Sequence, residues 1–76
     1  MSLYTHCGVT GAVVEGVTWL ADPPLGTDNP PPGWGNPFTA GSWQRTGDEG
    51  ATFTSDGGLT AAFVRAAPGT TLTPCR

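Results

Sequence analysis

Lysine and isoleucine are absent from this 76-residue chain, and the only arginines are the scattered Arg45, Arg65 and Arg76. Nucleic-acid binding needs several clustered cations that neutralise phosphates, and the net charge of −3 has the opposite sign. The composition therefore argues against nucleic acid as a partner. No apolar run approaches the roughly 20 residues of a membrane-spanning helix, so we expect no transmembrane segment in this chain.

Large apolar side chains are also scarce, because Leu, Val and Phe together make up less than a fifth of the chain. Gly (12) and Pro (8) make up more than a quarter, a composition that borders on disorder. The small net charge, seven aromatic residues and two cysteines favour folding instead. We therefore expect a single small, loop-rich domain over residues 1–76, with marginal stability unless it is cross-linked.

No helix is expected, because glycine or proline interrupts every window in which a helical apolar pattern would begin. Short alternating segments separated by turn residues predict strands instead. In Leu3–Cys7, for example, Leu3, Thr5 and Cys7 share one face, while Leu59, Ala61 and Phe63 share a face later in the chain. We predict an all-β fold, a small antiparallel meander of about six short strands curled into a barrel or sandwich. The strand segments are 3–7, 12–14, 17–21, 42–45, 51–55 and 59–65, and residues 70–75 can add a last strand at a sheet edge.

Two connections in this fold can be predicted in more detail. Glu15-Gly16 joins two strands as a tight hairpin, and glutamate disfavours positive φ, so we expect a type I turn with only Gly16 left-handed. Residues 22–37 contain six prolines and three glycines. Proline lacks an N–H donor, so we expect a long Pro/Gly-rich loop here, with no central strand running through it.

Cys7 and Cys75 lie near opposite ends of the chain. Two thiols and one imidazole without CxxC spacing do not make a metal site, so a disulfide is the more economical interpretation. It would close a loop of nearly the whole chain, stabilise the fold by roughly 4 kcal/mol and tie the first strand to the last. Disulfides persist in oxidising compartments, which predicts an extracytoplasmic protein. The alternative is two independent buried thiols in a cytosolic protein.

Three segments carry a resemblance to a known group of proteins: YTHCG at residues 4–8, WLADPPL at 19–25 and NPPPGWGNP at 29–37. With a cysteine near the end, this pattern resembles short uncharacterised actinobacterial proteins, some of which look like exported or lipid-anchored proteins. The resemblance implies a Cys7–Cys75 bridge and an extracytoplasmic location, and it implies no activity. The chain lacks a signal peptide or lipobox at its start, which leaves the location open.

We find no pattern that predicts catalysis. His6 and Cys7 are adjacent, so on a strand their side chains diverge, and a disulfide would consume the thiol. None of the serines has a nucleophile-elbow pattern around it. Asp48 and Glu49 lie between glycines as turn residues, and no calcium-loop spacing is present. We therefore expect no enzyme activity, catalytic residue, metal or cofactor.

The aromatic residues are the richest candidate feature. On their strands, Trp19 and Trp43 are expected to fill the core. Trp34, held between two glycines, either plugs the barrel end or stands on the loop as a contact residue. The candidate binding residues are Tyr4, His6, Trp34 and Asn36.

The long, stiff loop on a minimal β scaffold suggests a non-enzymatic extracytoplasmic domain that contacts a protein or cell-envelope partner. One alternative is a small-molecule or carbohydrate-binding module that uses Tyr4, His6 and Trp34. A structural phage or envelope component is another.

Overall fold

A computed structural model describes residues 1–26 and 29–72, and over these residues the protein is built from strands and turns, with no helix. The six strands are β1 (Ser2–Tyr4), β2 (Val9–Val14), β3 (Val17–Leu25), β4 (Phe38–Arg45), β5 (Gly50–Ser55) and β6 (Thr60–Arg65). The prediction of an all-β fold with about six short strands is confirmed.

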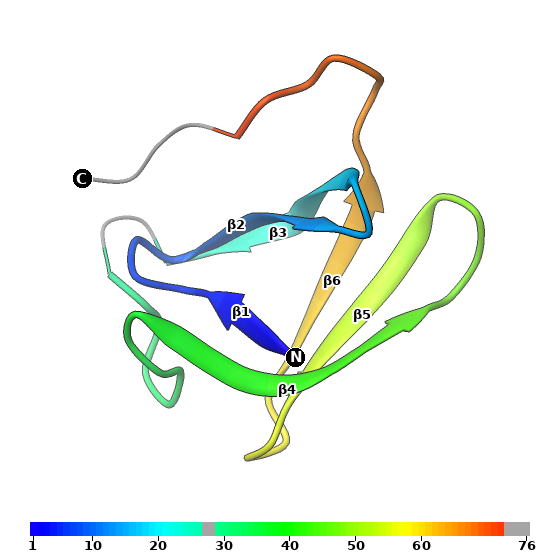
Figure 1. The fold of residues 1–76 in the computed structure, drawn as a ribbon. Helices are drawn as coiled ribbons and strands as arrows, with labels where there is room; N and C mark the ends of the chain where they lie inside the picture. Colours follow the sequence, from blue (N-terminus) through cyan, green and yellow to red (C-terminus); the bar gives the residue numbers. More distant parts are fainter. Residues whose placement is uncertain (27–28, 73–76) are drawn as a thin grey trace.

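All six strands form one antiparallel sheet in the order β1-β4-β5-β6-β3-β2, which curls until it is nearly closed into a barrel (Figure 1). The order is not that of a simple meander. Only β2–β3 and β4–β5–β6 pair in sequence, whereas β3 pairs with β6, and β1 pairs with β4. The connection from β3 to β4 therefore leaves one end of the sheet and returns near the other.

The core lies inside this curled sheet and combines large and small side chains. Phe53 faces Ala61 across the β5–β6 pair, and Phe63 faces Ala51. Each ring therefore lies beside a small neighbour, an arrangement that fills space with few large residues. The buried apolar residues are Leu3, Val9, Trp19, Ala21, Ala51, Phe53, Ala61 and Phe63. Leu59, expected on the same face as Phe63, instead precedes β6 and is 36% exposed.

The predicted hairpin at Glu15-Gly16 is confirmed, but the predicted turn type is wrong. Val14 pairs directly with Val17, and both turn residues have positive φ, 53° at Glu15 and 79° at Gly16. This is the type I′ arrangement, whose twist matches that of the two strands it joins. A two-residue type I′ connection requires positive φ at both turn residues, and this requirement outweighs the preference of Glu15 for negative φ.

The predicted Pro/Gly-rich loop over residues 22–37 begins later than expected. Strand β3 continues through Pro23 and Pro24 to Leu25. The register of the β2–β3 pair shifts there, since Val9 pairs with Leu25 while Gly11 pairs with Leu20. Pairing between β3 and β6 ends at Ala21. The prolines thus occupy a bulge where no ladder donor is needed, and the loop proper begins after Leu25.

Two further expectations concern the chain ends. Strand β1 ends at Tyr4, so His6 and Cys7 belong to a turn in which the Gly8 N–H donates to the Thr5 carbonyl at 3.0 Å. No strand is present at residues 70–72, and the rest of the expected last strand lies outside the described residues. Leu72 nevertheless packs over Gly11 of β2, where a Cβ would lie 2.5 Å from the Leu72 Cδ2 atom.

Candidate functional site

Two aromatic rings lie on the outside of the barrel where β1 meets β4. Tyr4 and Phe38 are direct partners in this pair, and their ring centroids are 5.4 Å apart in an edge-to-face arrangement. Tyr4 points outward because strand geometry alternates the side chains, and its neighbours Leu3 and Thr5 are buried. The residues Tyr4 and Phe38 are 45% and 54% exposed, so both offer apolar area to solvent.

His6 and Asn36 lie beside this pair and bind each other. The His6 Nδ1 and Asn36 Oδ1 atoms are 2.7 Å apart, and the His6 ring centroid is 6.2 Å from that of Tyr4. With the amide oxygen as acceptor, Nδ1 carries the proton, so Nε2 of a neutral ring is an acceptor and the Asn36 amide nitrogen is a donor. We call Tyr4, His6, Asn36 and Phe38 the Tyr4 surface.

A buried polar network fixes this surface from behind. The hydroxyl of Thr5, which is fully buried, donates to the Gly35 carbonyl at 2.6 Å and lies 3.1 Å from the Thr39 hydroxyl. The Thr39 hydroxyl accepts the Gly35 N–H at 2.8 Å. The Thr5 N–H donates to the Pro37 carbonyl at 2.8 Å, which ties β1 to the residues on both sides of Asn36. These bonds set Asn36 next to His6.

Trp34 does not belong to this group. Its ring stacks on Phe53, with centroids 6.0 Å apart and an interplanar angle of 29°, and it packs half-buried against the core. Phe53 is fully buried inside the barrel, whereas Tyr4 faces outward. Of the four predicted binding residues, Tyr4, His6 and Asn36 therefore come together, and Trp34 covers the core instead.

The remaining predicted residues are placed as follows. Cys7 is half-buried in the same turn as His6, while Cys75 lies outside the described residues, so the disulfide stays a prediction. Asp48 and Glu49 are exposed in the β4–β5 turn. Over the described ranges, no group of three or more His, Cys, Asp and Glu residues could hold a metal ion.

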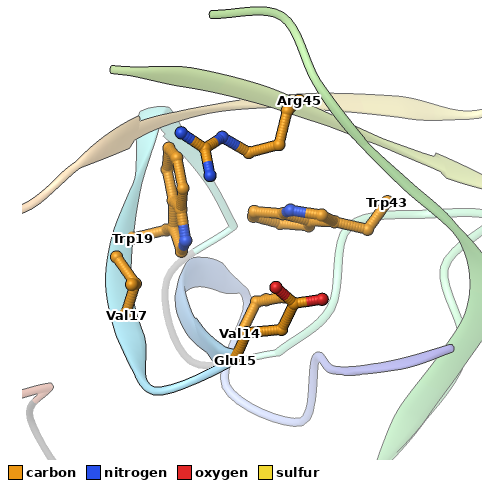
Figure 2. A pocket seen from close by; sticks show the side chains of 6 residues that line it. All are labelled: Val14, Glu15, Val17, Trp19, Trp43 and Arg45. Atoms are coloured by element: carbon orange, nitrogen blue, oxygen red, sulfur yellow. The ribbon is translucent and has the colours of Figure 1, made fainter. Parts of the chain in front are cut away.

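A second feature, which sequence reasoning missed, is a pocket of about 100 Å³ between the β2–β3 hairpin and the end of β4 (Figure 2). It is lined by Val14, Glu15, Val17, Trp19, Trp43 and Arg45. Phe38 was missed as well. The sequence holds a weak signal for Phe38 only, a large apolar residue that begins a strand directly after a proline.

No family model, curated protein or solved structure matches the chain, so the resemblance to actinobacterial proteins stays a prediction. None of the described residues forms a helix that is long and apolar enough to cross a bilayer.

Proposed function

We propose that this protein is a non-enzymatic extracytoplasmic binding module whose Tyr4 surface contacts a protein or another component of the cell envelope. The observation that carries the proposal is the exposure of Tyr4 and Phe38. Of the other aromatic residues of the strands, Trp19, Phe53 and Phe63 are at most 2% exposed, and Trp43 packs half-buried against the core. Because the chain has so few large apolar residues, two adjacent rings exposed on the outside of the barrel indicate a binding surface.

The chemistry of this surface supports a contact role. Aromatic rings supply large apolar area at a small cost in side-chain entropy and are enriched at the energetic centres of protein interfaces. His6 and Asn36 add a hydrogen-bond donor and an acceptor at the border of the rings. The network of Thr5, Gly35 and Thr39 holds these groups before a partner arrives, which lowers the entropic cost of binding.

Capture of a cell-envelope fraction by the immobilised protein tests the proposal. We expect Phe38→Thr or Tyr4→Thr to weaken capture by about tenfold, because each removes one ring of the contact. Val13→Thr is the matched control, since Val13 is a strand residue 61% exposed elsewhere on the barrel. The melting temperature should change little in all three variants. Equal capture by the ring variants and the control would contradict the proposal.

Carbohydrate binding is a second candidate, which the His6–Asn36 hydrogen bond beside two rings favours. Sugars are bound by aromatic faces together with polar groups at their edges. Calorimetric titration with a panel of glycans tests it, and Asn36→Ala should abolish any heat of binding. Trp34→Phe should leave the affinity unchanged, because Trp34 lies against the core. Absence of heat across the panel would leave protein contact as the function.

The extracytoplasmic part of the proposal depends on the predicted pair of Cys7 and Cys75. Mass spectrometry of the native protein after alkylation tests it directly. We expect no alkyl group without reductant and two after reduction, since a disulfide protects both sulfur atoms. Alkylation of native, oxidised material without reductant would contradict both the cross-link and the location.

A further inference from the structure

The pocket near Trp43 follows from the unequal lengths of β1 and β4. Strand β1 pairs only with the first part of β4, where Ser2 is the partner of Ala40, and Met1 bonds to Gly41. Beyond Gly41, the strand pairing described for β4 is with β5 alone. Trp43 and Arg45 lie on this second part, and the tip of the β2–β3 hairpin lies across the pocket from them (Figure 2).

Two tryptophan rings form walls of this pocket. Trp19 and Trp43 have centroids 5.5 Å apart and ring planes at 70°, so the walls meet almost at a right angle. Trp43 is held from behind by Phe63, with centroids 5.0 Å apart. Trp19 is buried, whereas Trp43 is only half-buried and presents the accessible ring. The volume of about 100 Å³ equals that of roughly three water molecules, enough for a group of a few heavy atoms.

Charged groups lie on both sides of Trp43. Figure 2 shows the Trp43 ring between the side chains of Arg45 and Glu15. The Arg45 guanidinium carbon lies 4.9 Å from the Trp19 ring centroid. Its Nε and Nη2 atoms donate to the carbonyls of Gly47 and Asp48, at 3.2 and 3.1 Å. Arg45 is thus already engaged by a ring and two carbonyls of its own chain.

Glu15 differs from Arg45 in its contacts. The type I′ turn places it at the rim of the pocket, and within the described ranges its carboxylate takes part in no hydrogen bond or ion pair. A carboxylate and the face of a tryptophan ring both attract positive charge. Val14 and Val17 add apolar surface beside them.

We propose that this pocket binds an organic ammonium group, of the size of trimethylammonium, between the Trp43 ring and the Glu15 carboxylate. The accessible Trp43 ring with a carboxylate at the rim suits a cation that carries methyl groups, because the methyl groups contact this ring and the valines. A metal ion is not favoured, since Glu15 is the only carboxylate among the described residues that line the pocket. An anion is not favoured either, because the Glu15 carboxylate repels it and two N–H groups of the Arg45 guanidinium already donate to carbonyls.

Titration of the full chain with choline, followed by tryptophan fluorescence and by calorimetry, tests the proposal. The reference ligand is 3,3-dimethyl-1-butanol, which has the shape of choline without its charge. We expect choline to bind about tenfold more tightly than this alcohol, because only the charged form gains from the ring and the carboxylate. Equal affinities, or no saturable binding of choline, would overturn the proposal.

Three variants locate the site. Glu15→Gln keeps the size of the side chain and should weaken choline binding several-fold, whereas Glu49→Gln, in the exposed β4–β5 turn, is the matched control and should not. Arg45→Gln should leave choline binding unchanged or tighten it, since a like charge is removed. Loss of choline binding in Arg45→Gln with an unchanged melting temperature would overturn the assignment of the cation to Trp43 and Glu15. So would equal effects of Glu15→Gln and Glu49→Gln.

Discussion

In the β4–β5–β6 meander two buried aromatic rings face alanines, whereas at the corner between β1 and the start of β4 buried hydroxyls and backbone groups bond to one another beside Leu3. Phe53 and Phe63 represent the first kind of interior. Thr5, Thr39 and Gly35 represent the second. The difference shows that a chain with few large apolar residues uses packing for one part of its barrel and directional hydrogen bonds for another.

The two kinds of interior suit different tasks. Packing of rings on small residues contributes most of the stability, because apolar burial is the dominant favourable term in folding. A hydrogen-bonded corner contributes less net free energy, but it fixes atoms at defined distances. The Tyr4 surface lies on the hydrogen-bonded corner, where His6 and Asn36 need a fixed separation. The region that contributes most of the stability is thus separate from the region that positions the residues of the Tyr4 surface.

The largest effect is expected from Phe53→Ala in the packed region. Phe53 is fully buried and contacts Trp34, so its loss leaves a cavity that two regions of the molecule line. We expect a loss of about 3–5 kcal/mol in the free energy of unfolding, measured by urea denaturation. A loss below 1 kcal/mol would mean that the meander is not the main source of stability.

The next effect is expected from Gly41→Ala, which tests how closely the packed region fits. A Cβ at position 41 would lie 2.6 Å from the Phe53 Cζ atom and against the carbonyl of Thr54. The backbone must shift, and we expect a loss of about 2 kcal/mol. Gly47→Ala is the matched control, because a Cβ at position 47 meets no atom within 4 Å. Similar unfolding midpoints for both variants would show that the fit at Gly41 is loose.

A smaller effect on stability is expected from Thr5→Val, which breaks the hydrogen-bonded corner without changing its shape. The Gly35 carbonyl loses its donor, at a cost of about 1–2 kcal/mol. Thr54→Val, at an exposed strand position, is the control and should cost almost nothing. Amide hydrogen exchange should accelerate at Gly35 in Thr5→Val while staying slow in β5. Uniform acceleration over the whole barrel would contradict the separation of the two interiors.

The smallest effect, and the only favourable one, is expected at the β2–β3 turn, which belongs to neither interior. Asparagine adopts positive φ more readily than glutamate, so Glu15→Asn should raise the free energy of unfolding by about 0.5–1 kcal/mol. The melting temperature measured by circular dichroism checks this. Glu49→Asn should leave it unchanged, because Glu49 has no positive φ. A lower melting temperature for Glu15→Asn would mean that Glu15 stabilises the turn through its side chain.

Much of the fold could be predicted from the sequence, because the alternation of buried and exposed residues is local. Phe53 between Thr52 and Thr54, and Tyr4 between Leu3 and Thr5, indicate strands and their faces without knowledge of the partners. The order of the strands could not be predicted in this way. The pairing of β1 with β4 depends on contacts between residues that are far apart in the sequence, and no short segment predicts such contacts.

The same limit explains which residues of the candidate site could be predicted from the sequence and which could not. Tyr4 and His6 are close in sequence and were found together, and Asn36 joined them through the β1–β4 pairing. Phe38 and the pocket at Trp43 were missed because their residues come from strands whose neighbours were unknown. Trp34 was ambiguous for a different reason, since a tryptophan between two glycines has no strand pattern to indicate its face.

The contact between Leu72 and β2 has its basis in the glycine at position 11. Gly11 lacks a Cβ, and the space that a methyl group would fill is occupied by the side chain of Leu72. Any larger residue at position 11 would have to displace the Leu72 side chain, and its Cβ would also lie 2.8 Å from the carbonyl oxygen of Trp19. Position 11 is therefore where a single methyl group would separate Leu72 from β2.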